Sequence, residues 1–136
     1  MSKGYVKGRY AEERLVLKLL SLGWIACRTP MSGGVVQVDV EAIKPSEKRL
    51  ALIEVKSTLK KSLKIPAESL ERLKSRYETW YKHIMRADWR VEYVLAVLWR
   101  VKGGRGFWVL KDIGEQVNSL TPLTISREDR EWSWRP

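Results

Sequence analysis

The residues best suited to chemistry interrupt two apolar stretches of the sequence. Residues 53–56 read Ile-Glu-Val-Lys, and Asp39 stands between Val38 and Val40. Side chains on a β-strand alternate between its two faces, so Glu54 and Lys56 should point the same way. A carboxylate and an ammonium group are costly to bury without partners. The pair therefore either faces solvent or serves a site.

The two acids are expected on neighbouring strands joined by a short polar turn, which would set the carboxylate of Asp39 opposite that of Glu54. Carboxylate oxygens are hard ligands that suit Mg²⁺, with Mn²⁺ as a substitute. Beside them, Lys56 would orient or help deprotonate an attacking water and offset charge on a phosphate. The pattern indicates metal-dependent hydrolysis of a phosphate ester.

A third carboxylate, Glu12, lies in a stretch whose apolar residues recur at helical spacing. With Glu12 at 0° on a helical wheel, five apolar residues fall within about 80° on either side. They are Leu15, Val16, Leu19, Leu20 and Leu22. Glu12 is therefore expected to face the protein body from the middle of this stripe, with Glu13 at its edge. The alternative is that Glu12 lies in a frayed first turn and only favours the positive end of the helix dipole.

Helices and strands must alternate along the chain to position these residues. The expected helices cover residues 5–22, which end at Gly23, residues 66–87, which begin at Pro66, and residues 112–120. The expected strands cover residues 24–28, 35–43, 50–57, 91–101 and 107–111. This order predicts an α/β fold with a central mixed β-sheet flanked by helices.

The length of 136 residues is enough for one compact domain, which we expect to span residues 1–120. Residues 121–136 lack a clear period and are expected to form a loosely ordered tail that carries Trp132 and Trp134. The tryptophans expected in the core are Trp24, Trp80, Trp99 and Trp108.

The charge balance favours a polyanionic partner. The chain carries 26 basic and 16 acidic residues, a formal net charge of +10. Such an excess on a small domain favours nucleic acid, although charge by itself is equally compatible with a basic protein of another function. No apolar run approaches the roughly 20 residues of a membrane span, and the N-terminus lacks a secretory signal, so we expect a cytoplasmic, nucleoid-associated protein. One cysteine and one histidine exclude an internal disulfide and a His/Cys zinc site.

Asp39 followed by Glu54-Val55-Lys56 resembles the PD-(D/E)xK nuclease motif, with Val38 where the motif has proline. More specifically, about the first 60 residues resemble the archaeal Holliday junction resolvases. The shared features, in order, are Lys7-Gly8, Glu12, Gly23-Trp24, Arg28, Ser32-Gly33-Gly34, Asp39 and Glu54-Val55-Lys56-Ser57. The resemblance implies a restriction-endonuclease-like nuclease core.

The resemblance also implies a homodimer that resolves four-way DNA junctions by paired, Mg²⁺-dependent nicks. It makes Glu12, Asp39 and Glu54 the metal ligands and Lys56 the catalytic lysine. Ser32 matches a serine of the loop beside the active site, and Arg28 matches a basic residue that approaches the phosphate backbone. Basic residues also lie on segments that flank the site, and the expected DNA contacts are Lys7, Arg9, Arg28, Lys60, Lys61 and Lys64, with Arg72, Lys74 and Arg76 nearby in sequence.

Two other functions stay open at this stage. The chain could be a PD-(D/E)xK nuclease with a different DNA target, or a DNA-binding protein of the same fold without activity. The presence of all four catalytic residue types argues against the second. The tryptophan-rich C-terminus matches no feature of the resolvases.

Overall fold

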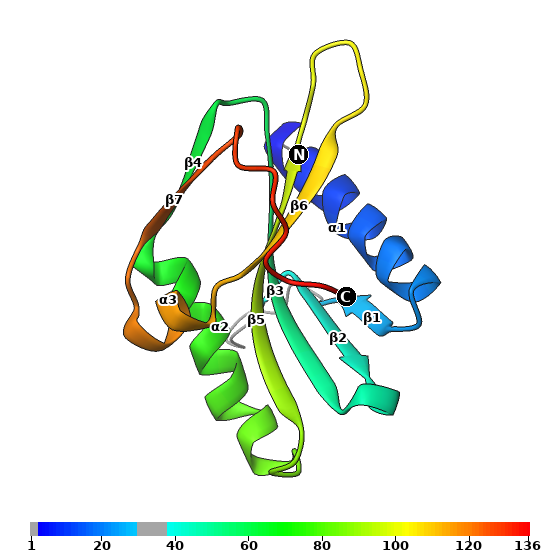
Figure 1. Ribbon diagram of the computed structural model, residues 1–136, viewed down its shortest axis with the longest axis vertical. Helices are drawn as coiled ribbons and strands as arrows, with labels where there is room; N and C mark the ends of the chain where they lie inside the picture. Colours follow the sequence, from blue (N-terminus) through cyan, green and yellow to red (C-terminus); the bar gives the residue numbers. More distant parts are fainter. Residues whose placement is uncertain (1–2, 30–37) are drawn as a thin grey trace.

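The structure is a computed structural model that describes the backbone of residues 3–29 and 38–136 and the side chains of residues 9–29 and 38–136. It has the expected α/β architecture, a mixed sheet flanked by helices (Figure 1). The helices are α1 (Lys3–Ser21), α2 (Ala67–Thr79) and α3 (Gly114–Ser119), with 3₁₀ turns η1 (Pro45–Glu47) and η2 (Tyr81–His83). The strands are β1 (Ile25–Arg28), β2 (Val40–Lys44), β3 (Arg49–Thr58), β4 (Ser62–Ile65), β5 (Arg90–Trp99), β6 (Phe107–Asp112) and β7 (Leu123–Ser126).

The main sheet has the strand order β1-β2-β3-β5-β6. β3 runs parallel to β5, and the other neighbours in this sheet are antiparallel. A parallel pair needs a crossover connection, which the segment containing α2 provides. The two central strands, β3 and β5, are therefore covered on both sides and read as nearly continuous apolar runs.

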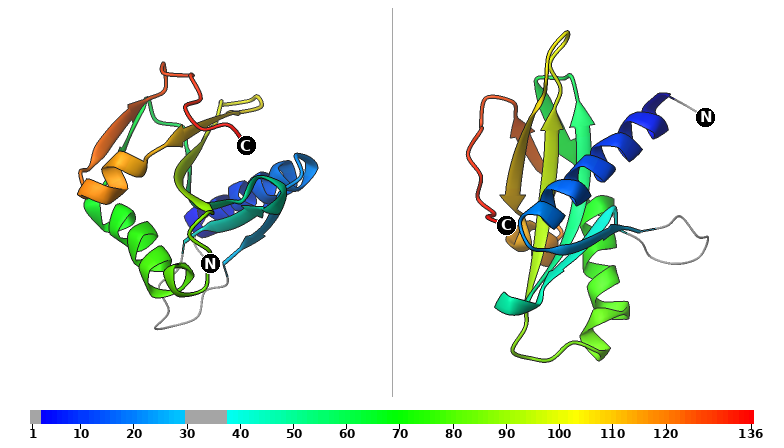
Figure 2. Two further views of the ribbon diagram at one scale, coloured as in Figure 1. Left: turned by 60° about the horizontal axis from the view of Figure 1, so that its bottom comes forward. Right: turned by 90° about the vertical axis from the view of Figure 1, so that its right-hand side faces the viewer.

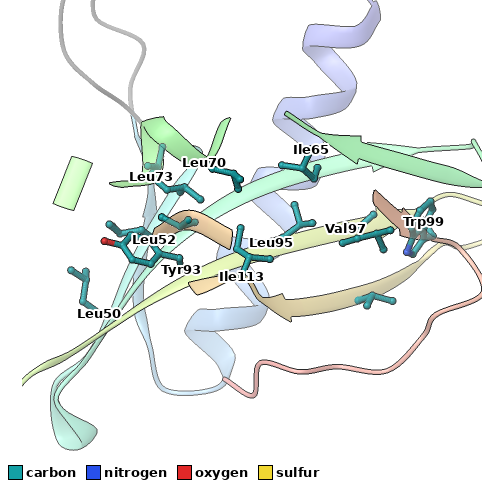
Figure 3. Close-up of a cluster of buried hydrophobic side chains, with 14 residues drawn as sticks. Leu50, Leu52, Ile65, Leu70, Leu73, Tyr93, Leu95, Val97, Trp99 and Ile113 are labelled. Atoms are coloured by element: carbon teal, nitrogen blue, oxygen red, sulfur yellow. The ribbon is translucent and has the colours of Figure 1, made fainter. Parts of the chain in front are cut away.

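The two faces of the sheet carry separate hydrophobic clusters. α1 covers one face, where Leu15 and Leu19 pack against β2 and β3 residues such as Ala51 and Ile53. α2 and α3 cover the other face, as the turned views show (Figure 2). There Leu70 and other helix side chains meet the opposite side chains of β3 and β5, including Leu52 and Leu95 (Figure 3). The alternation of residues along β3 thus assigns each of its side chains to one cluster.

The N-terminal helix ends as its sequence predicts. Gly23 adopts a positive φ of 90°, a conformation that glycine reaches without steric cost. The buried stripe of α1 consists of Ala11, Leu15 and Leu19, each fully buried. Leu20 and Leu22 are 47% and 44% exposed, so the stripe is narrower than the sequence suggested. Among the described residues, no helix combines the length and apolar character of a membrane span.

The helix that follows the central hairpin is shorter than expected. Pro66 is the residue before its first turn, and α2 ends at Thr79, where we expected residue 87. The reason is that β5 must begin at Arg90 beside the start of β3, where the N–H of Arg90 donates to the carbonyl of Lys48 at 2.8 Å. Residues 80–89 are needed for this return. Trp80 consequently lies 47% exposed at the end of α2, so its expected place in the core was wrong.

The segments after residue 58 hold two strands that the sequence did not predict. The basic connector after β3 forms β4, which pairs antiparallel with β7 near the C-terminus. Residues 121–136 are also not the loosely ordered tail we expected. Trp134 is 2% exposed and packs on Trp24, with ring centroids 5.4 Å apart. Trp134 therefore belongs to the cluster on the α1 face of the sheet, whereas Ile125 of β7 belongs to the cluster on the α2 face (Figure 2).

Candidate active site

Glu54 and Lys56 lie on the α2 face of β3, as strand alternation predicts. The Lys56 Nζ atom lies 3.6 Å from Glu54 Oε1. The Glu54 side chain is only 4% exposed, whereas that of Lys56 is 33% exposed. The Glu54 carboxylate is thus buried, whereas the Lys56 ammonium group beside it is accessible to solvent.

Asp39 lies opposite Glu54, although it does not belong to a strand. It occupies a bend directly before β2, whose pairing with β3 begins at Val40 and Ile53. The Asp39 Oδ2 atom accepts a hydrogen bond of 2.8 Å from the Val55 backbone N–H. We expected a strand over residues 35–43, of which residues 35–37 lie outside the described residues. Because Asp39 lies in this bend, its side chain does not follow the alternation of β2, and its hydrogen bond to Val55 holds it against the backbone of β3.

Arg72 of α2 is the main feature of the site that the motif did not reveal. Its Nη2 atom lies 3.3 Å from Glu54 Oε1 and 3.4 Å from Oε2, and it also donates to Ser69 Oγ at 3.3 Å. The sequence placed Arg72 among the basic residues near the site without giving it a partner. Its position depends on where α2 packs against β3, which no local pattern states.

Glu12 approaches the site from α1, on the other side of the strands. Its side chain is 18% exposed, against 49% for Glu13, so Glu12 is the more buried of the two, as predicted. It lies at the edge of the buried stripe, beside Leu15, because Leu20 and Leu22 turned out to be exposed. Arg28 of β1 donates from Nη2 to Glu12 Oε2 at 3.4 Å, which ties the helix to the edge strand.

The three carboxylates influence one another through Asp39. Burial and, after it, the negative charge of Asp39 together raise the pKa of Glu54 to about 7, although Lys56 and Arg72 act in the opposite direction. Burial also raises the pKa of Glu12, again with Asp39 adding to the effect and Arg28 opposing it. Crowded carboxylates in a poorly solvated place are unfavourable unless cations compensate them. Arg28, Lys56 and Arg72 compensate the negative charge of these carboxylates in part.

The donor set suits a hard divalent cation. Glu12, Asp39 and Glu54 supply carboxylate oxygens, and the described chain has no competing thiolate or imidazole at this place. Among the described residues, no three acidic, His or Cys side chains already have the spacing of a metal site. In this arrangement Glu54 is held by Arg72 and Lys56, and Asp39 by a backbone N–H.

The other residues proposed from sequence are distributed around this centre. Arg9 is exposed and forms a salt bridge of 3.0 Å with Glu13. Lys60, Lys61 and Lys64 are exposed on the segment that follows β3 and on β4. The backbone of Lys7 lies in α1, but its side chain lies outside the described residues, as does the whole of Ser32.

Comparisons with known proteins identify the family of the chain and the fold that it shares. Residues 3–79 match the family described as archaeal Holliday junction resolvase (Hjc). The fold is similar to that of Hjc from Archaeoglobus fulgidus, a Holliday junction resolvase from an archaeal hyperthermophile, with a TM-score of 0.63 and 20% sequence identity over 91% of this chain and 87% of that chain. A comparison with curated proteins gives no match.

The matched segment runs from α1 to the end of α2 and is more than half of the chain. It contains the three carboxylates, Lys56 and Arg72. The structural similarity covers 91% of the chain and therefore extends beyond this segment. The chain therefore belongs to the archaeal Holliday junction resolvase family of junction-resolving endonucleases.

Proposed function

We propose that the protein resolves four-way DNA junctions by two divalent-metal-dependent nicks, each made at Glu12, Asp39, Glu54 and Lys56 of one subunit. The observation that carries this proposal is the arrangement around Asp39: two further carboxylates whose pKa values its charge raises, beside the lysine of the same strand face. Phosphodiester hydrolysis needs an oriented water, a stabilised leaving oxygen and neutralised phosphate charge. These side chains have the chemistry for that task.

Each residue has its own part in this proposal. Glu12, Asp39 and Glu54 would hold the metal ion, with Mg²⁺ the first candidate and Mn²⁺ a substitute. When bound, such an ion lowers the pKa of water and offsets charge on the scissile phosphate. Lys56, which is partly exposed, points its ammonium group to the same place and orients the attacking water beside the phosphate. We retain Ser32 as a proposed residue of the loop beside the site.

The arginines around the site act as positioning residues. Arg72 holds Glu54 through both carboxylate oxygens, and Arg28 holds Glu12. A cation that binds the carboxylates would compete with these arginines. A DNA phosphate would offer each guanidinium an alternative partner of the same charge. We therefore expect Arg28 and Arg72 to contact the backbone of the bound strand.

Binding of the junction would rely on charge and shape. The net charge of +10 and the exposed lysines near β4 provide contacts to phosphates that carry little sequence information. The proposed DNA contacts are Lys7, Arg9, Arg28, Lys60, Lys61 and Lys64. Because its substrate is DNA, we expect the protein to act in the cytoplasm, at the nucleoid.

Two matched cuts favour a homodimer. A four-way junction has near two-fold symmetry, and a protein with closed two-fold symmetry presents two equivalent sites. One chain of this size carries one proposed site, so a single subunit would have to rebind between cuts. We propose that two subunits act together on one junction.

The direct test compares labelled four-way junction, linear duplex and single strand, each with Mg²⁺, with Mn²⁺ and with a chelator. Paired nicks in opposite strands of the junction alone, and only with the metal ion, support the proposal. Equal cutting of linear duplex would assign the protein a different DNA target. Tight binding without cutting in either metal ion would make it a DNA-binding protein without activity.

Substitution of Glu54 tests the site itself. Glu54→Ala should reduce cleavage to background because it removes a metal ligand, while junction affinity measured with a chelator stays within about threefold because no phosphate contact is lost. Glu71→Ala, at an exposed glutamate of α2, is the matched control and should cut at the parental rate. Parental cleavage by the Glu54 variant would show that the site is elsewhere.

A further inference from the structure

A hollow of about 580 Å³ lies between the N-terminal half of α1 and the hairpin that joins β5 to β6. This hairpin extends beyond the sheet at the end of the molecule where α1 begins (Figure 1). The volume is within the usual range for sites that hold a small molecule or part of a larger ligand. The described residues that line it are Tyr10, Arg14, Ser57, Leu59, Leu98, Arg100, Val101, Lys102, Gly104, Arg105 and Gly106.

The hollow is strongly basic. Arg14 comes from α1, and Arg100, Lys102 and Arg105 come from the β5–β6 hairpin. None of the described residues that line the hollow is acidic, and none of these four cations forms an ion pair within the described chain. Four uncompensated cations around one concave surface favour an anionic ligand.

Part of the lining of the same hollow is apolar. A surface that bound only phosphate groups would not need this apolar part. Tyr10, Leu59 and Val101 are 58%, 50% and 41% exposed. The Arg14 guanidinium lies 5.6 Å from the centre of the Tyr10 ring, so charge and aromatic surface occur side by side. A ligand that covered these side chains would remove apolar surface from water.

Two polar atoms of the lining still lack partners. Ser57 Oγ and Arg100 Nε are buried, and neither has a hydrogen-bond partner within the described chain. A buried polar group without a partner is unfavourable. A small shift of these side chains toward the hollow would let acceptor atoms of a ligand satisfy the Arg100 donor, and the Ser57 hydroxyl can both donate and accept.

This hollow is distinct from the proposed active site. Ser57 and Leu98 lie on the α1 face of the sheet, opposite the α2 face that carries Glu54 and Lys56. On α1, Tyr10 is about 160° from Glu12 around the helix axis, on the other flank of the buried stripe. The two sites therefore share α1 and β3 while they open on different sides of both elements.

The walls of the hollow are specified by the hairpin sequence. Gly103 has a positive φ of 74° at the turn. At Gly106, a Cβ atom would come within 2.5 Å of the Trp99 carbonyl oxygen and 3.1 Å of a Leu98 side-chain carbon. A side chain at either position would distort the turn or force the strands apart. The glycines thus keep the hairpin narrow in the segment that carries Arg100, Lys102 and Arg105.

We propose that this hollow binds one unpaired nucleotide of the DNA substrate, with its base on Tyr10 and Leu59 and its phosphates on the hairpin cations. The ligand class follows from the lining, because a nucleotide joins a flat apolar ring to negative charge. A paired duplex offers only phosphates and would leave the apolar side unused. Single-stranded DNA is bound in this way, by stacking on aromatic rings within basic grooves. The inference rests on the proposed function, in that the nucleotide comes from a base pair at the branch point that opens when the junction binds.

The test measures binding with a chelator present, so that cleavage does not enter. The probes are a single-stranded oligonucleotide with 2-aminopurine at one position, the same strand in a paired duplex, and a four-way junction with 2-aminopurine at the branch point. Tyr10→Leu removes the ring, and the double variant Lys102→Gln with Arg105→Gln removes two exposed charges. The control, Lys82→Gln with Arg86→Gln, removes the same charge from exposed positions between α2 and β5, a segment at the opposite end of the molecule from the hairpin (Figure 1).

The wild type should bind the single strand and quench its fluorescence. Tyr10→Leu should weaken this binding at least about fivefold and remove the quenching, with a smaller effect on the duplex. The hairpin double variant should lower the slope of log affinity against log salt for the single strand by about 1.4, and the control variant should not. Equal effects of the hairpin and control variants, or unchanged quenching in Tyr10→Leu, would overturn the proposal.

Failure of this proposal can be told from failure of the proposed function. If the protein cuts junctions and Tyr10→Leu binds all three probes like the wild type, the hollow has no such role and the proposed function stands. If the wild type never cuts a junction yet shows the Tyr10-dependent quenching, the nucleotide site stands without the proposed nuclease.

Discussion

Two features of the Glu54 environment both disfavour its negative charge while no cation is bound. Glu54 is nearly fully buried, and it lies beside Asp39, so its negative charge is poorly solvated and repelled. Arg72 and Lys56 compensate this only in part, since the pKa remains raised to about 7. A site that binds a cation should have this character, because the arrangement is unfavourable until the cation arrives.

The raised pKa predicts a specific dependence of stability on pH. A carboxyl that binds its proton more tightly when folded, at about 7 against 4.5, favours folding most below 4.5, and this contribution is lost as the pH rises through 7. With a chelator present, Glu54→Gln should therefore be more stable than the wild type at pH 8, by up to about 3 kcal/mol, and similar to it near pH 4. Urea unfolding at both pH values measures this.

The control for that measurement is Glu71→Gln, at an exposed glutamate of α2, which should change stability little at either pH. A loss of stability in Glu54→Gln at pH 8 would contradict the prediction and show that Arg72 and Lys56 need the carboxylate for folding. Addition of Mg²⁺ should stabilise the wild type at pH 8 and leave the variant nearly unchanged.

The two neighbouring glutamates of α1 provide a sharper test of the site. Glu12→Gln should lower the cleavage rate by at least about 100-fold and raise the Mg²⁺ concentration required, because it removes a proposed ligand. Glu13→Gln removes only exposed ion pairs with Arg9 and Arg28 and should change the rate less than about fivefold. Cleavage rates against Mg²⁺ concentration check both. The reverse ranking would place Glu13 in the site.

At the scale of elements, the C-terminal segment is held to the main sheet by several specific contacts. Arg49 contacts the rings of both Trp24 and Trp134, with its guanidinium carbon 4.8 and 5.5 Å from their centres. It also donates to Glu92 and to the backbone carbonyl of Arg135. The indole N–H of Trp134 donates to the same Glu92 at 3.0 Å. These contacts join the C-terminus to the first residues of β3 and β5.

Loss of this contact should be costly. Trp134→Ala should reduce the free energy of unfolding by about 3–5 kcal/mol, because it removes a buried ring and leaves a cavity around Arg49. Trp80→Ala is the matched control. Its ring is 47% exposed and lies over Arg76, so the loss should be about 1 kcal/mol or less. Urea unfolding gives both values, and equal losses would contradict the assigned role of Trp134.

For the whole molecule, the question is how one site per chain makes two matched cuts. If two subunits act together, a mixed dimer with one Glu54→Ala subunit should nick a supercoiled cruciform plasmid once and release an open circle. The wild-type dimer should release linear product, because both cuts fall within one binding event. Gel electrophoresis of the plasmid separates the forms. Linear product from the mixed dimer would contradict this model, because it would show that one active subunit makes both cuts.

The sequence by itself determined what depends on local periodicity and on composition. A strand alternates its side chains every second residue, so Glu54 and Lys56 had to share a face wherever β3 was placed. The difference in burial between Glu12 and Glu13 followed from helical spacing in the same way. The high positive charge, the glycine that ends α1, and the order of most helices and strands were equally readable.

Only the tertiary structure decided which distant groups meet. The pairing of β4 with β7, the burial of Trp134 and the contact of Arg72 with Glu54 join residues far apart in the chain. The end of α2 at Thr79 likewise depends on where β5 must begin beside β3. Such contacts depend on how whole elements pack. The hydrophobic effect favours burial against any apolar partner, and the spacing of residues along the chain does not determine which partner a side chain contacts.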